Sequence, residues 1–181
     1  MEYLLANGQK LRIRAAKRED AAALLQMFRL AVTETPFLMT DPREAEQLTL
    51  EQEEAFVDGY RQSANHLFLV ADVGGGIAGS LTITQSKWFK QRHVGELGIV
   101  ILRDYWNMGI GRRMINTMLQ WVERHPLIRC LHLNVMAHNE KAIRIYKKFG
   151  FTEHGRLEKA ALQPGDRYED LILMSLWVPD R

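Results

Sequence analysis

The sequence predicts an α/β fold with a mixed central sheet of about seven strands and about four helices. Strand-like runs and helix-like periodicities alternate in the order β-α-α-β-β-β-α-β-α-β-β, without a repeat, a low-complexity tract or a linker. Two segments, 93–122 and 128–148, each have an apolar strand followed by an amphipathic helix. A length of 181 residues suits one domain, 1–181, with a sizeable core.

Composition limits the classes of function. The net charge is +2 with acids and bases interspersed, so we expect no nucleic-acid partner. The N-terminus has no long apolar run, which argues against a signal peptide or membrane helix and favours a cytoplasmic protein. The single cysteine, Cys130, excludes an intramolecular disulfide, and we expect a buried thiol at the start of a strand.

The N-terminal half supplies a strand and two helices. Residues 11–15 alternate apolar and charged side chains, as a half-buried strand does. An apolar stripe predicts a helix over 20–33, and Pro36 and Pro42 then break the following segment into a turn-rich connection. Thr49 is a suitable N-cap for a helix over 50–62, with glutamates in its first turn.

The remaining elements follow from short apolar runs and turn residues. Three consecutive glycines between two such runs predict a hairpin. The polar and aromatic stretch 87–92 predicts a loop. We expect strands at 66–73, 77–86, 93–102, 128–136, 151–162 and 168–178, and a helix at 139–148.

A glycine-rich turn lies between the strand that ends near Leu102 and the next helix. Gly109 and Gly111 are at the start of that helix, where glycine permits a sharp turn and close approach of a ligand. The free amides of a helix N-terminus bind phosphate well, and Arg112 adds positive charge. A dinucleotide fingerprint needs a third glycine where Met114 stands, and a P-loop needs Gly-Lys-Ser/Thr, so neither is predicted.

A second motif makes the interpretation of the glycine-rich turn more specific. The pattern Val-x-x-x-Asn-x-x-Ala, then Tyr, then Gly-Phe is met by Val135, Asn139, Ala142, Tyr146, Gly150 and Phe151. Together the two motifs resemble the GNAT superfamily of acyl-CoA-dependent N-acetyltransferases. The family's Arg/Gln-x-x-Gly-x-Gly/Ala motif is met by Gly109 and Gly111, with Trp106 in place of Arg/Gln. This variant and the stretch 168–174 are similar to the ribosomal-protein N-terminal and spermidine acetyltransferase branch.

The resemblance implies a fold, a reaction and a set of binding residues. The two central strands would splay and leave a V-shaped cleft for acetyl-CoA, which would donate its acetyl group to a primary amine by direct attack in a ternary complex. The acceptor stays open among a polyamine, an amino-acid-like metabolite, an antibiotic and a protein N-terminus. For the partners of the chain, we expect acetyl-CoA, an amine acceptor and a second copy of the chain in a homodimer. The cofactor-binding residues that the resemblance implies are Ile99, Val100, Ile101, Trp106, Asn107, Met108, Gly109, Ile110, Gly111, Arg112, Asn139, Ala142 and Tyr146.

Tyr146 and Glu96 are the candidates for proton transfer. Tyr146 is protonated at neutral pH, since an unperturbed phenol has a pKa near ~10, and the resemblance places it near the CoA sulfur. It also lies on an apolar helix face, so plain core packing is its alternative. Glu96 interrupts an apolar strand, which is costly unless it is paired. It is a candidate base or water-holding group, and a carboxylate at the cleft rim is the alternative.

Other polar and aromatic residues are weaker candidates. His93 is expected at the surface or hydrogen-bonded, and on the strand face opposite Glu96. His132 and His138 lack a metal-ligand pattern, so we expect no metal site. Trp88 and Phe89 would line the acceptor pocket or pack against the edge of the core.

A binding module is the alternative to an enzyme. A non-catalytic acyl-CoA-binding sensor or assembly subunit would need the glycine turn at Gly109 and Gly111. An enzyme would also need Tyr146 and a path for protons. The two hypotheses therefore differ at the tyrosine and not at the turn.

Overall fold

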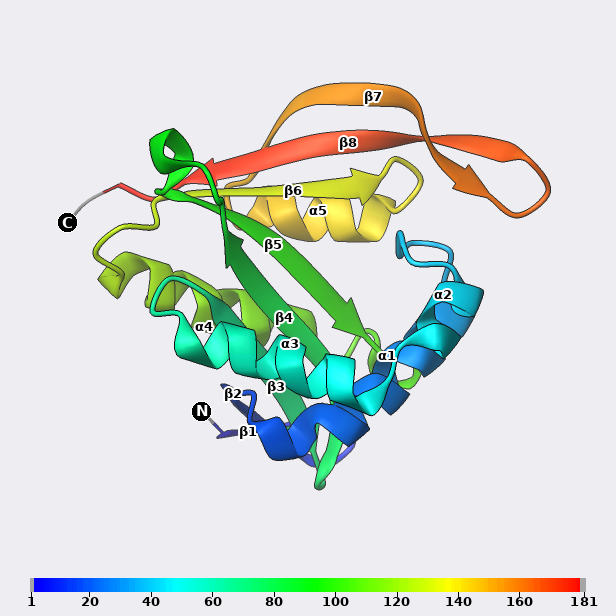
Figure 1. Cartoon of the computed structure of the whole chain (residues 1–181), viewed down its shortest axis with the longest axis vertical. Helices are drawn as coiled ribbons and strands as arrows, with labels where there is room; N and C mark the ends of the chain where they lie inside the picture. Colours follow the sequence, from blue (N-terminus) through cyan, green and yellow to red (C-terminus); the bar gives the residue numbers. More distant parts are fainter. Residues whose placement is uncertain (1, 180–181) are drawn as a thin grey trace.

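The computed structural model describes residues 2–179 and places eight strands in one sheet, in the order β1-β2-β3-β4-β5-β6-β8-β7 (Figure 1). The strands are β1 (Glu2–Leu4), β2 (Lys10–Ala15), β3 (Leu67–Val73), β4 (Gly76–Gln85), β5 (Val94–Ile101), β6 (Cys130–Met136), β7 (Thr152–Gln163) and β8 (Arg167–Trp177). The helices are α1 (Ala21–Glu34), α2 (Pro42–Gln47), α3 (Leu50–Gln62), α4 (Ile110–Arg124) and α5 (Glu140–Lys148). Short 3₁₀ turns are η1 (Arg18–Asp20), η2 (Phe89–Gln91) and η3 (Arg103–Tyr105).

Every neighbouring pair in the sheet is antiparallel except β5 and β6. These two are parallel because α4 connects them, which returns the chain to the same end of the sheet. In Figure 1, α1 and α3 lie in front of the sheet, while α4 and α5 lie behind it. The predicted mixed α/β fold is confirmed.

Two elements of the described chain were missed in the sequence. β1 is only three residues long, too short to show alternation. Pro42 was interpreted as a breaker, yet it occupies the first turn of α2, where a proline needs no hydrogen bond. Asp41 caps that helix by accepting from the backbone N–H of Arg43 at 2.9 Å. The other boundaries agree with the prediction to within two residues, and the helix predicted at 50–62 matches α3 at both ends.

Two hydrophobic cores hold the helices to the sheet. The larger lies between the sheet and α4, whose buried stripe repeats every three or four residues, as the sequence predicted. The smaller joins α1 and α3 to the opposite face, through Leu24, Val57 and Val70. Thr49 caps α3 as predicted, accepting from the backbone N–H of Gln52 at 3.2 Å.

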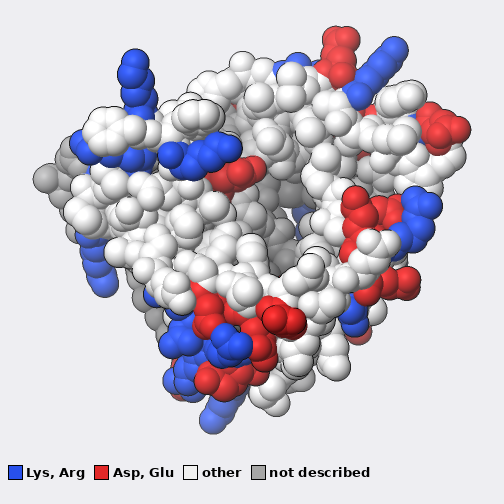
Figure 2. Space-filling view, in the orientation of Figure 1, with Lys and Arg blue, Asp and Glu red and all other residues white. Residues whose placement is uncertain are grey.

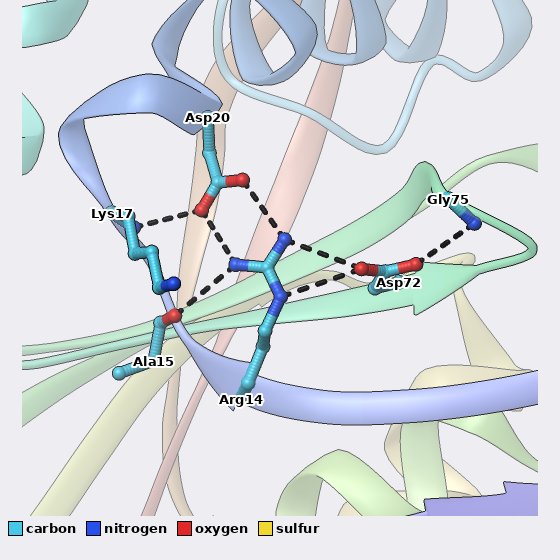
Figure 3. A network of polar contacts seen from close by, with 6 residues as sticks. All are labelled: Arg14, Ala15, Lys17, Asp20, Asp72 and Gly75. Carbon is cyan, nitrogen blue, oxygen red and sulfur yellow. Dashed lines mark hydrogen bonds and ion pairs between the residues drawn. The ribbon is translucent and has the colours of Figure 1, made fainter.

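Arg14 connects three parts of the fold by ion pairs (Figure 3). Its guanidinium, on β2, donates to the Asp20 carboxylate at 2.6 and 2.9 Å and to the Asp72 carboxylate at 3.3 and 3.4 Å. Asp72 in turn accepts from the Gly75 backbone at 3.1 Å, in the turn between β3 and β4. The three charged side chains are 13–20% exposed. The hydrogen bonds from Arg14 hold the pKa of Asp20 below its usual range.

We predict that Arg14→Gln lowers the free energy of unfolding at pH 7 by roughly 1–3 kcal/mol, since charged hydrogen bonds to two carboxylates are lost. A lowered pKa in the folded state gives stability that is present above the unfolded pKa of about 4 and is lost as the pH falls through the folded value. The difference between variant and wild type should therefore shrink below about pH 4. Denaturant titrations across pH measure it.

Arg12→Gln is the matched control. Arg12 lies on the same face of β2, two residues earlier, and is exposed. We expect it to change the unfolding free energy by no more than about 0.5 kcal/mol. If Arg14→Gln and Arg12→Gln lower the free energy of unfolding equally, or if the effect of Arg14→Gln stays constant down to about pH 2, the ion pairs of Arg14 do not stabilise the fold as proposed.

Candidate functional site

The sheet opens between β5 and β6. These strands are paired only from Val94↔Cys130 to Glu96↔His132. Beyond that point β5 stays paired with β4 as far as Ile101, and β6 stays paired with β8 as far as Met136. The facing edges of the two strands therefore diverge, and the predicted splay is confirmed. Beyond that point, the backbone N–H and C=O groups on the facing edges do not pair with the opposite strand. Since buried backbone groups need hydrogen-bond partners, a ligand in the opening can supply them.

The opening leads into a cavity of about 1020 Å³. Figure 2 shows a hollow near the centre of the face that α1 and α3 cover, with mostly uncharged walls. Strand β5, the glycine turn, the end of β6 and the first turns of α5 line it. All predicted site residues line this cavity except Met108 and Glu96. Met108 packs against the large core instead.

The glycine turn has the geometry that the sequence predicted. Gly109 is the residue before α4 and has φ of +79°, a left-handed conformation that glycine adopts without strain. A Cβ on Gly111 would lie 3.2 Å from Cδ1 of Ile101, so the turn packs closely on the end of β5. The first amides of a fifteen-residue helix thus point towards the cavity end of β5.

Trp106 connects the turn to the open edge of β5. Its indole N–H donates to the backbone carbonyl of Ile101 at 2.7 Å. The ammonium of Lys141, on α5 across the cleft, lies 5.4 Å from the centre of the indole ring. Trp106, which stands in place of the Arg/Gln of the motif, therefore binds the end of β5 through its indole N–H. It lies where the two halves of the cleft face each other.

Positive charge gathers around this part of the cavity. Asn139 caps α5 by accepting from the backbone N–H of Ala142 at 3.2 Å, so a second helix N-terminus faces the cleft. Cationic side chains from α4 and α5 line the same wall: Arg112, Lys141, Arg144 and Lys148. Two helix N-termini and these cations suit a ligand that carries several phosphate groups.

The position of Tyr146 fits both alternatives that the sequence left open, core packing and proton donation. Its ring is 8% exposed, packs in the large core and lies 5.7 Å from the ring of Phe151. It also lines the cavity, and no residue within 2–179 lies within hydrogen-bond distance of its hydroxyl. Burial raises the pKa of Tyr146 well above the usual value. The phenol is therefore protonated at neutral pH and able to donate to a ligand.

Glu96 lies at the apex of the opening and not inside it. It is in the last pair that joins β5 to β6, and its side chain is exposed. The Glu96 carboxylate is therefore not buried inside the apolar strand, as its place in the sequence had suggested. Its carboxylate has no ion-pair or hydrogen-bond partner among residues 2–179. Side chains alternate along a strand, so Glu96 points to the face covered by α1 and α3.

The wall opposite the glycine turn was missed in the sequence. It is formed by the connection after α1, with Thr35, Phe37, Leu38 and Met39. Phe37 packs on the ring of His138, with centroids 4.9 Å apart, and His138 forms an ion-pair contact with Glu169 on β8. No motif marks this loop, and only its packing against β8 brings it to the cleft.

That loop is also tied to the C-terminal hairpin. The buried Gln163 side chain, on β7, donates to the backbone carbonyl of Pro36 at 3.0 Å. The contact joins residues far apart in sequence and closes one side of the cavity.

Several other predictions have a structural outcome. Trp88 and Phe89 are 64% and 77% exposed, so they neither line the cavity nor pack on the core edge. The Lys87 ammonium lies 5.3 Å from the centre of the Trp88 ring, and the Arg92 guanidinium lies 4.7 Å from the centre of the Phe89 ring. Cys130 is half-buried, less than predicted, and burial raises the pKa of its thiol. The ring of His93 lies 6.1 Å from Trp177.

Some predictions concern absences or assembly. Within residues 2–179, no cluster of three or more His, Cys, Asp and Glu side chains has the arrangement of a metal site. None of the described helices is long and apolar enough to cross a membrane. The cytoplasmic location and the homodimer stay predictions.

Comparison with protein families gives one match over most of the chain. The family model described as the acetyltransferase (GNAT) family matches residues 24–151. The L-amino acid N-acetyltransferase AaaT of Escherichia coli K12 is 31% identical over 107 residues, which are 59% of this chain and 65% of that protein. The match thus spans slightly less than two thirds of that relative.

Solved structures match the fold over almost its whole length. An acetyltransferase of the GNAT family from Streptococcus pneumoniae superposes with a TM-score of 0.89 at 33% identity, covering 93% of this chain and 99% of that one. The Salmonella typhimurium protein yncA, solved with its cofactor acetyl-CoA, superposes with a TM-score of 0.84 at 19% identity, covering 94% and 95%. At that identity the second match bears on the fold alone.

Proposed function

This chain belongs to the acetyltransferase (GNAT) family, and we propose that it transfers the acetyl group of acetyl-CoA to the primary amine of a small acceptor with an apolar side chain. The observation that supports this most is the opening of the sheet between β5 and β6 beside the glycine turn. It joins a free backbone edge to a phosphate-binding helix N-terminus in one cavity.

Acetyl-CoA has a pyrophosphate, a long pantetheine arm and a thioester, and the cavity has a suitable surface for each. The amides after Gly109 and the side chain of Arg112 would bind the pyrophosphate. The edge of β5 from Ile99 to Ile101 would pair with the amide groups of the arm, as an added strand does. The cations of α5 would face the remaining phosphate.

The thioester supplies an acetyl group that an unprotonated amine attacks directly. Two protons have to move in this reaction. The acceptor ammonium loses one before attack, and Glu96, directly or through water, takes it. The departing thiolate gains one, and Tyr146 donates it from a hydroxyl that has no other partner within 2–179. The nitrogen of the new amide loses its second proton, which restores the tyrosine.

The charge of the cavity favours a monoamine over a polyamine. Among the lining residues within 2–179, the only carboxylate is Glu140, which is paired with Arg144 at 3.0 Å. The second ammonium group of a polyamine would lie among cationic side chains and have no anionic partner, which is energetically costly. Phe37, Leu38 and Met39 instead form an apolar wall. An amino acid with an apolar side chain fits this wall, in agreement with the substrate named for the Escherichia coli relative.

A panel of amines tests the proposal. Release of CoA from acetyl-CoA is measured with L-leucine, spermidine and an alanine-initiated peptide at pH 7.5. We expect kcat/KM for L-leucine to exceed the other two values by about tenfold or more. A preference for spermidine would contradict the monoamine acceptor. Binding of acetyl-CoA without CoA release for any amine would favour the alternative, a non-catalytic acyl-CoA-binding module.

A side chain at Gly111 should block the approach of the pyrophosphate. We predict that Gly111→Val weakens acetyl-CoA binding by about a hundredfold, since it removes close contact with the amides at the start of α4. Because a Cβ there also approaches Ile101, the thermal unfolding midpoint is recorded beside the calorimetric affinity. Gly155→Val is a control, since a Cβ there has open space. Equal acetyl-CoA affinity in folded Gly111→Val would contradict binding at this turn.

Removing only the hydroxyl of Tyr146 separates its two roles. We predict that Tyr146→Phe keeps acetyl-CoA affinity and lowers kcat by about a hundredfold or more, the usual contribution of a general acid. A lost ordinary hydrogen bond would cost only about 1 kcal/mol, close to fivefold. Steady-state CoA release with the best amine measures the effect. A rate within about threefold of wild type would assign Tyr146 to packing alone.

A further inference from the structure

Five neighbouring strands each place one polar side chain in a single row across the sheet. The register pairs Thr84 with Glu96, Glu96 with His132, and His132 with Ser175, which in turn pairs with Thr152. Paired residues of adjacent strands point to the same face, and the strands lie about 4.8 Å apart. The row therefore runs from β4 to β7 without interruption. We name it the polar row.

Both ends of the polar row are fixed by hydrogen bonds. At one end, the Tyr60 hydroxyl from α3 lies 2.5 Å from Oγ1 of Thr84, which shows that the row is on the face covered by α1 and α3. At the other end, the imidazole of His154 contacts the Ser175 hydroxyl and lies 3.2 Å from Oγ1 of Thr152. A bulge in β7 at Glu153/Gly155 turns His154 towards this face.

The two central members lie at the apex of the cleft. Glu96 and His132 form the last pair before β5 and β6 diverge. Neither side chain has an ion-pair or hydrogen-bond partner among residues 2–179. Leu131 and Leu133, the neighbours of His132 on β6, are buried on the opposite face. An imidazole at this position is not needed for packing, and it lies beside the carboxylate that borders the acceptor side.

We propose that His132 is a positioning residue for Glu96, and that it accepts the acceptor's proton from Glu96 and passes it along the polar row to solvent. The inference rests on the proposed acetyl transfer. Since the two side chains are not in hydrogen-bond contact, a water between them carries the proton: the O–H bond of protonated Glu96 breaks as the water accepts its proton, and an N–H bond forms on His132 as the water gives up another. His132 then releases the proton to water beside Ser175 and the exposed His154. The Glu96 carboxylate is thereby restored for the next acceptor.

The groups around His132 agree with this direction of transfer. Glu96 faces it from β5, and Ser175 and His154 face it from β8 and β7. Cys130 is the nearest titratable side chain on the same face of β6. Tyr60 and Thr84 lie beyond Glu96 and are bonded to each other, so they do not compete for the proton. A bound acceptor would cover Glu96. The polar row would then be the route by which the proton on Glu96 reaches water.

The test compares His132→Gln with wild type across pH. We expect kcat/KM for the amine to fall by about tenfold near pH 6.5, where the acceptor arrives as an ammonium ion. The loss should shrink to less than about twofold near pH 9.5, where the amine is already neutral. Acetyl-CoA affinity and the thermal unfolding midpoint should not change.

Two further variants make the test specific. His93→Gln makes the same chemical change outside the polar row and the cavity, and it should leave the pH profile unchanged. The double variant Glu96→Gln, His132→Gln should be no slower than Glu96→Gln alone, since residues that act as a unit are not additive. Additive losses, a loss that is equal at every pH, or no loss at all would overturn the proposal.

Failure of the inference differs from failure of the proposed function. If wild type releases no CoA with any amine of the panel, acetyl transfer is wrong and the role of His132 is wrong with it. If wild type is active and His132→Gln has the wild-type pH profile, acetyl transfer stands and only the relay is overturned.

Discussion

The structure depends on one constraint, which is that the two central strands cannot pair along their full length. β5 and β6 leave each other after Glu96 and His132, so each needs another source of stability beyond that point. Each obtains it from its other neighbour, β4 for the first strand and β8 for the second. At the opening, the indole of Trp106 binds the end of β5, and the ring of Phe37 packs on His138 after the end of β6.

The same constraint brings the functional groups together. Each of the two diverging strands ends in a turn that starts a helix, so the N-termini of α4 and α5 both reach the open edge. Two positive dipole ends then face one cavity whose wall also has cationic side chains. The proposed phosphate-binding turn, the open backbone edge and the buried phenol are brought together by one topological feature. The groups proposed to transfer protons lie at the same feature, since Glu96 and His132 are the residues at which the strands separate.

The parts of the site that the sequence predicted are those with local signals. A glycine at φ of +79° and an asparagine N-cap are short-range features, so the turn at Gly109 and the start of α5 at Asn139 could be predicted from neighbouring residues. Phe37 reaches the cavity through contacts that are distant in sequence: its ring packs on that of His138, and Gln163, more than a hundred residues later, binds the adjacent backbone. The polar row was equally hidden, because a register across five strands has no signature in any one of them. Glu96 was found as a polar residue in an apolar strand, but its exposure depends on where the strands part.

Amide hydrogen exchange with and without acetyl-CoA tests the central claim most directly. If the free edge of β5 binds the substrate, the amides of residues 97–101 and those at the start of α4 should gain protection when acetyl-CoA is added. The amides of β8 that are already paired with β6 should change little. Protection that appears on the β7–β8 hairpin while residues 97–101 and the start of α4 stay unchanged would contradict a cofactor site in the opening of the sheet.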